Sequence, residues 1–425
     1  MTRHGALSII TNIQPGLLQR MIDMLSEMEA TGVSDNPVVP FGKIASIHFA
    51  RFVVLPSHED NTGQPMPARL AFTTNYDLPL ENHLQELISV AGKGLWRIFS
   101  MCEGFSGDSS YNEALLAAYM KSVTVKTETF YVGVGNRSVL EIKQENELRK
   151  QIEAFFDRQR PANTNEEASV IRRKVIDFVN NNPALGWAKK PVEKGSLSWR
   201  MYFWGRLVLV ILLFIILLPL IIPFVMVWML LILMTEVREK DVYSELDKTH
   251  VRELVSREKA PVQCQFSALG NVKPGGVRKL TMLFLLRMTN FLAPYLFSQG
   301  KLSGIPTVHF ARWLILNNKE MVFLSNFDGN SESYLRDFIN IAGKQLSLMF
   351  CHTDGYPKTR FMVFGGADDA SGFMRWARRG QIITNVWYSA NPSVSVSNIF
   401  HNAKIRQGLY GSMTEKEAGK WLSLF

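Results

Sequence analysis

The chain has 425 residues, of which 47% are hydrophobic, and its formal net charge is +9. Its three cysteines, without a C-x-x-C spacing, exclude a disulfide framework and a cysteine-based zinc site. No Lys/Arg run is interleaved with aromatic residues, so the positive charge predicts an anionic lipid leaflet as partner and no nucleic acid. The length allows two or three domains, and the soluble parts are expected on the cytoplasmic face of a membrane.

The N-terminal part has the pattern of an α+β domain. In chain order, the expected elements are a strand at 6–13, a helix at 17–28, strands at 44–55 and 69–74 around a loop at 56–67, a helix at 80–99, a strand at 123–134 and an extra helix at 139–156. Without the extra helix, this order is the β-α-β-β-α-β plan of a ferredoxin-like unit.

An uncharged apolar segment, residues 207–234, lies in the middle of the chain. Its 28 residues would make a straight helix of about 42 Å, whereas two full spans need about 40 residues. Pro219 and Pro223 near its centre favour a kink. The segment is either a single tilted or kinked span or a shallow hairpin in one leaflet. We favour the hairpin, because basic residues flank both ends and a single span would separate the two halves of the chain.

The C-terminal part repeats the pattern of the N-terminal part. Its expected elements are a strand at 265–272, a helix at 277–297, strands at 305–316 and 320–325, a helix at 331–350, a strand at 360–364 and a C-terminal helix that opens at a capping box formed by residues 414–417. Residues 280–297 are apolar almost all round, which fits a helix buried against the other domain or a helix in the membrane plane.

Five short blocks occur twice in the same order. The pairs are 12–16 with 271–275, 47–55 with 308–316, 72–77 with 323–328, 88–93 with 339–344, and 103–105 with 354–356. They indicate a duplicated domain. We therefore expect two ferredoxin-like repeats that pack into one pseudo-dimeric α/β barrel. The expected regions are 1–160 and 263–425 for the repeats, 161–202 and 236–262 for linkers, and 203–235 for the membrane segment.

A histidine and an aspartate recur in both repeats at positions that suit a contact. Each histidine, His48 or His309, lies near the start of a strand, and the partner strand ends at Asp77 or Asp328. Such a carboxylate could fix the imidazole tautomer for ligation or proton transfer. Equally, each aspartate could cap the helix that follows it, with the histidine tying that turn to the sheet. The second interpretation is favoured, because one active site seldom needs two equivalent sets.

Other polar residues complete the set of candidates. Strand alternation places Arg51 and Arg312 on the face opposite the histidines, beneath the covering helices, where each is expected to meet a buried carboxylate. His352 and Asp354 occur only in the second repeat, where the first has Met101 and a glutamate, and this asymmetry makes them functional candidates. The basic cluster 375–379 is interpreted as a solvated helix face.

The paired His-Phe-Ala-Arg blocks, the Asn-Tyr/Phe-Asp blocks, the Asp-Gly-Tyr-Pro run at 354–357 and the Trp-Tyr-Ser-Ala-Asn-Pro run at 387–392 resemble largely uncharacterised bacterial proteins with tandem dimeric α/β-barrel domains. That group is similar in fold to the dye-decolorising peroxidases, which are haem enzymes. The resemblance implies a haem ligated by His309 or His352, with His309 as the leading ligand and Asp354 as a further cofactor-binding candidate. The peroxidase Gly-x-x-Asp-Gly signature is incomplete here, because residues 326–329 lack its first glycine.

Two functions follow as expectations. The first is a membrane-attached barrel that binds haem or another hydrophobic cofactor for redox chemistry, with His309, Asp328 and Arg312, and their counterparts His48, Asp77 and Arg51, as catalytic residues. The second is a non-enzymatic membrane-surface module, possible as a homo-oligomer, whose His–Asp pairs are structural. The sequence names no substrate for either.

Overall fold

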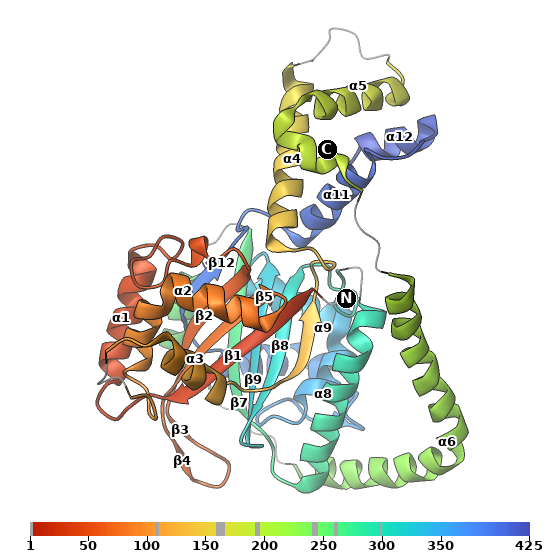
Figure 1. Ribbon diagram of the computed structural model, residues 1–425. Helices are drawn as coiled ribbons and strands as arrows, with labels where there is room; N and C mark the ends of the chain where they lie inside the picture. Colours follow the sequence, from red (N-terminus) through yellow and green to blue (C-terminus); the bar gives the residue numbers. More distant parts are fainter. Residues whose placement is uncertain are drawn as a thin grey trace.

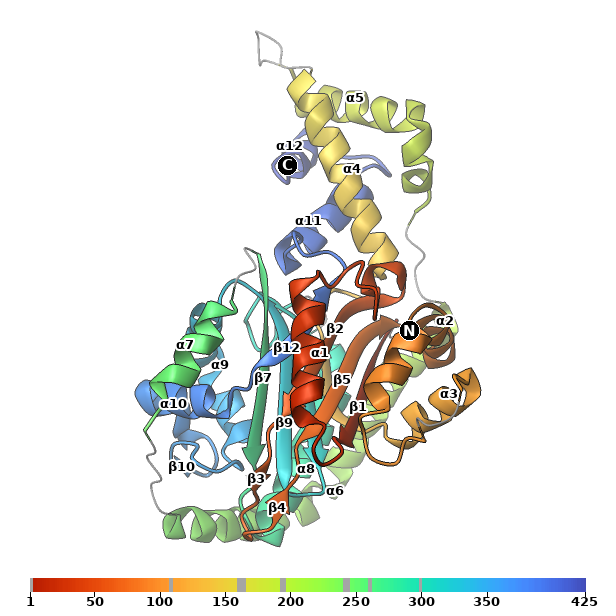
Figure 2. The same ribbon diagram turned by 90° about the vertical axis from the view of Figure 1, so that its left-hand side faces the viewer.

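The computed structural model describes residues 3–106, 110–158, 166–191, 196–239, 245–258, 262–297 and 300–425. Its body holds two antiparallel four-stranded sheets with helices on their outer sides (Figure 1). A group of helices stands above this body, and one long helix runs beside and beneath it (Figure 2). The predicted α+β class is confirmed.

Each sheet takes three strands from one half of the chain and one strand from the other half. The first sheet has the order β1 (His4–Asn12), β5 (Arg69–Asp77), β2 (Ile47–Leu55) and β12 (Thr384–Ser389). The second has the order β6 (Thr127–Val132), β8 (Val308–Leu316), β9 (Glu320–Asp328) and β7 (Gln263–Asn271). Two small hairpins pair β3 (His58–Glu59) with β4 (Pro65–Met66) and β10 (Thr359–Arg360) with β11 (Phe364–Gly365).

The exchanged strands β6 and β12 connect the two sheets. Just before β6 starts its pairing with β8, Thr124 forms a bridge with Ile9 of β1. Just before β12 starts its pairing with β2, Gln381 forms the corresponding bridge with Ala268 of β7. Backbone hydrogen bonds therefore lead from one sheet to the other on both sides.

The strand predicted at 360–364 is wrong, because the fourth strand of the C-terminal half is β12. Residues 359–365 form only the short β10–β11 hairpin. Phe361 and Met362 at its turn have φ values of 53° and 63°, a left-handed conformation that breaks an extended strand. The Glu236 carboxylate accepts hydrogen bonds from both of their backbone N–H groups, at 2.6 and 2.9 Å, which holds this turn in place.

Helices cover the outer face of each sheet and form the upper group. On the first sheet they are α1 (Leu18–Ala30), α2 (Leu80–Phe99) and α3 (Glu113–Ser122), with η1 (Phe41–Lys43). On the second they are α8 (Gly276–Leu296), α9 (Ser331–Phe350) and α10 (Ala370–Gly380), with α7 (Lys248–Ser256) and η3 (Gly366–Asp368). The upper group contains α4 (Val139–Arg158), α5 (Ala168–Asn181), η2 (Pro183–Lys189), α11 (Val396–Gln407) and α12 (Glu415–Leu422).

The upper group joins helices from both halves of the chain around its own core. Leu148 and Val175 from the first half pack with Ile405 and Trp421 from the second. Helix α12 starts at the predicted capping box, in which Thr414 accepts from the Glu417 backbone and the Glu417 side chain accepts from the Thr414 backbone N–H. This core fastens the two halves together a second time, away from the sheets.

The apolar segment forms a single helix, α6 (Leu197–Arg238), and both of its ends meet helix α8. Near its start, the Phe203 ring stacks on Tyr295 with 4.3 Å between ring centroids. At its end, Glu239 pairs with Lys273 at 2.7 Å and with Arg278. Among the described residues it is the one helix whose length and composition suit a membrane crossing.

Helix α6 bends because a straight helix could not reach both of these anchors. Its 42 residues would extend about 63 Å, whereas the 21 residues of α8 extend about 32 Å. Pro219 and Pro223 lie inside the helix, and each removes a backbone donor. The bend is visible in both views (Figure 1, Figure 2). The expected hairpin turn is absent, yet the two ends of the apolar segment lie on the same body.

Helix α8 covers the second sheet with one face and exposes apolar side chains on the other. Thr129 of β6 donates to the Leu286 carbonyl, which fixes the inner face. Leu280 and Phe284 on the outer face are 59% and 61% exposed. The helix is therefore packed against the sheet on one face, as one of the two interpretations expected. Its other face is apolar and exposed.

Candidate functional site

Both predicted His–Asp contacts are present, at the same end of the two sheets. His48 Nε2 lies 2.9 Å from Asp77 Oδ1, and His309 Nε2 lies 2.7 Å from Asp328 Oδ1. A β-bulge occurs at each histidine. The bulge corrects the predicted side-chain direction: the His309 ring meets the Phe49 ring between the sheets, with 5.4 Å between centroids. Arg312, predicted on the opposite face beneath the covering helices, also points between the sheets.

The aspartates cap helices, although not the helices that follow them in the chain. Asp77 Oδ2 accepts from Val139 N at 3.0 Å, and Asp328 Oδ2 accepts from Val396 N at 2.8 Å. These are the first residues of α4 and α11. A carboxylate at a helix N-terminus satisfies a free N–H group and the helix dipole. Each His–Asp pair thus fastens a strand of the body to the upper helices.

The two His–Asp sites differ by a third residue. His4 lies beside the first pair, with its Nε2 3.7 Å from Asp77 Oδ1 and 2.8 Å from the Arg137 carbonyl. Burial and the neighbouring His48 lower the pKa of His4 to about 4. His4, His48 and Asp77 offer three atoms that could hold a metal ion. The equivalent register position opposite Asp328 is Gln263.

The space between the histidines does not fit haem. His48 and His309 line the same cavity, whose volume of about 10 Å³ does not exceed the ~10–15 Å³ that a cavity needs to hold a single water molecule. The Nε2 atom of each histidine is already hydrogen-bonded to its aspartate. Haem ligation by His309, as the resemblance implied, would require the surrounding Phe49 and Val394 to move apart.

The arginines Arg51 and Arg312 do not meet the carboxylates expected for them. Each is buried and reaches across to the opposite sheet. Arg51 donates to the Phe266 carbonyl at 3.0 Å, and Arg312 donates to the Leu7 carbonyl at 2.6 Å. Further partners of both guanidinium groups are carbonyl, hydroxyl and amide oxygens. These bonds give the two arginines a structural role that joins the sheets.

His352 and Asp354 lie in different surroundings. His352 is fully buried, and burial together with Arg278 and Lys273 lowers its pKa to about 3. Asp354 lies at the rim of a cavity of about 390 Å³. Burial raises the pKa of Asp354. The structure therefore brings only Asp354, among the residues predicted to bind a cofactor, to a space that could hold a small molecule.

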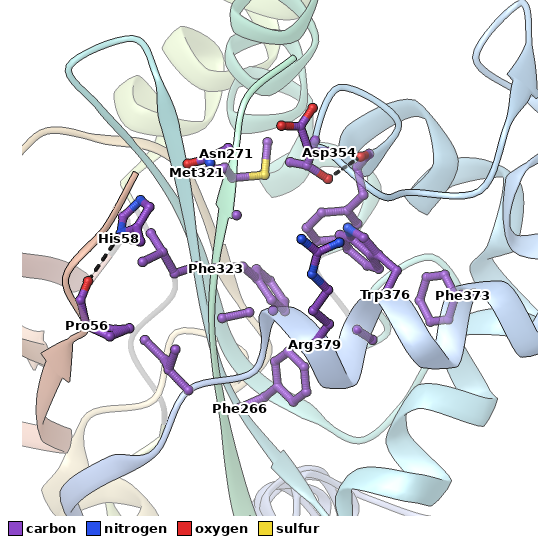
Figure 3. Close-up of a pocket in the computed structure, with 18 of the residues that line it drawn as sticks. Pro56, His58, Phe266, Asn271, Met321, Phe323, Asp354, Phe373, Trp376 and Arg379 are labelled. Atoms are coloured by element: carbon purple, nitrogen blue, oxygen red, sulfur yellow. Dashed lines mark hydrogen bonds between the residues drawn. The ribbon is translucent and has the colours of Figure 1, made fainter. Parts of the chain in front are cut away.

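The larger cavity lies between the outer face of β7 and β9 and the helices α9 and α10. Several aromatic side chains line it (Figure 3). The aromatic lining residues are Phe266, Phe323, Phe338, Phe350, Phe373 and Trp376. Its volume falls within the ~300–1,000 Å³ range of small-molecule sites, and its mainly apolar wall with a few polar groups is typical of them.

The rim of this cavity is closed by the β3–β4 hairpin, which belongs to the other half of the chain. Asn61 Nδ2 donates to the Val272 carbonyl at 2.7 Å, and Asn271 Nδ2 donates to the Glu59 carbonyl at 3.1 Å. Lys319 pairs with Asp60 at 2.5 Å and holds the pKa of that carboxyl below its ordinary value. The loop predicted at 56–67 is therefore a cover for a cavity of the second half.

Sequence reasoning missed this cavity, although the repeat contained a signal for it. When the blocks 12–16 and 271–275 are aligned, Ile9 of the first half is equivalent to Ala268 of the second. Ile9 bridges Thr124 and Ala268 bridges Gln381, which agrees with this match. Met120 and Ala377 each stand four residues before one of these bridging partners. Large side chains in one copy are thus small in the other, which indicates unfilled volume.

Comparisons with known proteins add nothing to these observations: no family model matches the chain, and neither the curated proteins nor the solved structures give a match.

Proposed function

We propose that the protein is a membrane-attached binding module in which the second half of the chain holds a small apolar molecule. The observation that carries this proposal is the aromatic cavity of about 390 Å³ between β7, α9 and α10. Two ferredoxin-like repeats, joined through their exchanged strands into one barrel, would supply the scaffold. The matched bridges at Ile9 and Ala268 support this arrangement.

Membrane attachment rests on helix α6. Its apolar side chains from Val208 to Val227 are largely exposed, and such a surface is stable in lipid but costly in water. Because both ends of α6 return to α8, the two halves are expected on one side of the bilayer, with the anionic cytoplasmic leaflet as the natural partner of a chain of net charge +9.

Same-side topology can be tested with single cysteines in vesicles. Cys102, Cys264 and Cys351 are buried, so Asn112→Cys in the first half and Ser393→Cys in the second, both at exposed positions, should react selectively with an impermeant maleimide. Both are expected to react from the same side, and the protein is expected to stay in the pellet after alkaline carbonate extraction. Reaction from opposite sides would refute the shared barrel.

Ligand binding can be tested by filling the cavity. The double variant Ala268→Ile/Ala377→Met introduces into the second half the larger side chains that the first half has at the equivalent positions. It is expected to weaken binding of a neutral apolar probe, 1-dodecanol, at least tenfold. Calorimetric titration of protein in lipid nanodiscs measures this. The control Ala118→Met adds the same side chain to an exposed position of α3 and should leave binding unchanged. Equal binding by all three proteins would place the probe elsewhere.

The His–Asp pairs have a structural role in this proposal, so haem is not required. Purified protein is expected to give no Soret band, either alone or after addition of haemin. A Soret band that His309→Ala removes would revive the redox function. If no apolar probe binds either, the remaining candidate is the surface module without a ligand, which the equal helix-capping roles of Asp77 and Asp328 favour.

A further inference from the structure

The cavity of the second half is polar at one end only. Its deep wall is aromatic, whereas the rim carries His58, Glu59, Asn271, Asp354 and Arg379. Phe266, Phe323 and Phe373 are buried, whereas Glu59 and Arg379 are exposed to solvent. In Figure 3, His58, Asn271 and Asp354 lie in the upper part of the view and Phe266 lies below them. A site with an apolar depth and a polar mouth fits a ligand with an apolar tail and a polar head.

Arg379 gives that polar mouth its permanent positive charge. The Arg379 side chain reaches from α10 across the opening, with its guanidinium directed into the space between His58 and Trp376 (Figure 3). Within the described ranges, no carboxylate lies at ion-pair distance from this guanidinium. A guanidinium offers five N–H donors in a fixed fork and matches a carboxylate or phosphate.

The other titratable groups of the rim are weaker candidates for binding an anion. His58 Nε2 lies 3.0 Å from Glu320 Oε1, and that glutamate is held by Arg69 at 2.5 Å. Asp354 has a raised pKa because it is buried. Glu59 is exposed to solvent. Arg379 is therefore the group at the mouth with the strongest tendency to bind a charged ligand.

The mouth lies close to the end of the membrane helix. Lys273, two residues after the rim residue Asn271, pairs with Glu239 at the end of α6 and donates its backbone N–H to the His352 carbonyl. Val272, which lies between Asn271 and Lys273, forms a β-bridge with Thr353, and Thr353 lines the cavity. A molecule that partitions into the lipid around α6 would therefore be concentrated near this opening.

We infer that the cavity takes a single-chain anionic amphiphile, with its chain among the aromatic side chains and its head group on Arg379. This inference rests on the proposed binding function and adds the ligand class. A fatty carboxylate and a single-chain phosphate share the required chemistry. Among the described residues of the first half, Ile9 and Met120 fill the corresponding position, and Ser122 stands where Arg379 would be.

The test compares charged and neutral probes of the same length. Dodecanoate, dodecyl phosphate and 1-dodecanol are titrated into wild type, Arg379→Gln and Arg375→Gln in lipid nanodiscs of zwitterionic lipid. Wild type is expected to bind at least one anion about tenfold more tightly than the alcohol, because hydrogen bonds to charged groups contribute more than neutral ones. Arg379→Gln should abolish this preference without weakening the alcohol.

The control Arg375→Gln removes a charge from the same helix but not from the cavity lining, and should keep the preference. The anion that binds more tightly identifies the head group. Equal affinity for alcohol and anions in wild type, or an anion preference that survives Arg379→Gln, would overturn the inference while leaving the binding function intact. Failure of all three probes to bind would instead reject the proposed function.

Discussion

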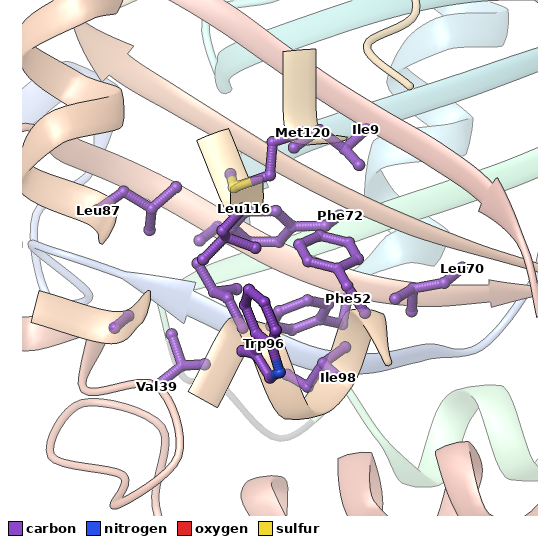
Figure 4. Packing of buried hydrophobic residues seen from close by; sticks show 14 of the residues in the cluster. Ile9, Val39, Phe52, Leu70, Phe72, Leu87, Trp96, Ile98, Leu116 and Met120 are labelled. Atoms are coloured by element: carbon purple, nitrogen blue, oxygen red, sulfur yellow. The ribbon is translucent and has the colours of Figure 1, made fainter. Parts of the chain in front are cut away.

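The two halves of this chain place the same elements around the outer face of their sheets, but only one half fills the space between them. In the first half, Ile9, Phe72, Leu116 and Met120 pack into a continuous apolar cluster (Figure 4). At the corresponding place in the second half, smaller residues leave a cavity of about 390 Å³. In our proposal, the first half keeps this space packed, while the second half has room for a ligand.

What the halves share is equally informative. Arg51 and Arg312 each cross to the opposite sheet, and Asp77 and Asp328 each hold a histidine and the start of an upper helix. Features present in both copies maintain the architecture. Features present in one copy are the candidates for function. The following changes test that division.

The largest effect is expected from creating a cavity in the packed core of the first half. Met120→Ala should lower the free energy of unfolding by about 2–5 kcal/mol, because the transfer and cavity terms add at a fully buried site. Its counterpart Ala377→Met fills existing space and should lose no stability, whereas overpacking a filled site costs about 1–3 kcal/mol. Urea unfolding in detergent measures both. A similar loss for the two variants would mean that the second half is as tightly packed as the first.

The next effect concerns the shared His–Asp pairs. His48→Ala and His309→Ala each leave a partly buried carboxylate with one partner fewer, and each should cost about 1–3 kcal/mol of stability. The two losses are expected to be equal within error, with dodecanol binding unchanged. A loss of ligand affinity in His309→Ala alone would give that histidine a role that its counterpart lacks.

An effect that is absent at neutral pH and appears only on acidification separates His4 from Gln263. The folded pKa of His4, about 4, lies below its unfolded value of about 6.5. The unfolded chain therefore takes up the proton first as the pH falls below 6.5. Stability is lost between pH 6.5 and 4 by about 1.4 kcal/mol per pH unit for this group. His4→Gln, which copies the second half, should reduce the acid sensitivity of unfolding. An unchanged pH profile would show that folding does not lower the pKa of His4.

The smallest effect is expected at the rim. Asp354→Asn removes a negative charge close to Arg379 and should strengthen binding of dodecanoate by about threefold, with no effect on dodecanol. Glu332→Gln, at an exposed position on α9 outside the cavity, is the control. Weaker anion binding in Asp354→Asn would mean that this carboxyl group takes part in holding the head group.

Local patterns predicted much of the fold. The long strands, the covering helices, the capping box at Thr414 and both His–Asp contacts follow from alternation, periodicity and the repeated blocks. The strand predicted at 123–134 contains β6, but its pairing with β8 could not be predicted, and β12 was missed, because the partner of each lies in the other half of the chain. The bend in α6 depends on its anchors, Tyr295 and Lys273, which are remote in sequence.

The candidate site was less predictable than the fold. Motif reasoning selects residues that carry chemistry, such as His309, whereas the cavity arises from residues that are small, such as Ala268 and Ala377. Arg379 was interpreted as part of a solvated helix face, since nothing local shows that the β3–β4 hairpin approaches it. Space left by small side chains becomes apparent only when the residues of one copy are compared with those of the other.

The most direct measurement is photolabelling with a dodecanoate that carries a diazirine near its tail, followed by peptide mapping of the labelled protein in lipid nanodiscs. The label is expected in α9 and α10, on peptides that contain Phe338, Phe350 or Phe373, and should disappear in Ala268→Ile/Ala377→Met. Labelling of α1, α2 or α3 in the first half, or of α6 alone, would contradict a ligand site confined to the second half.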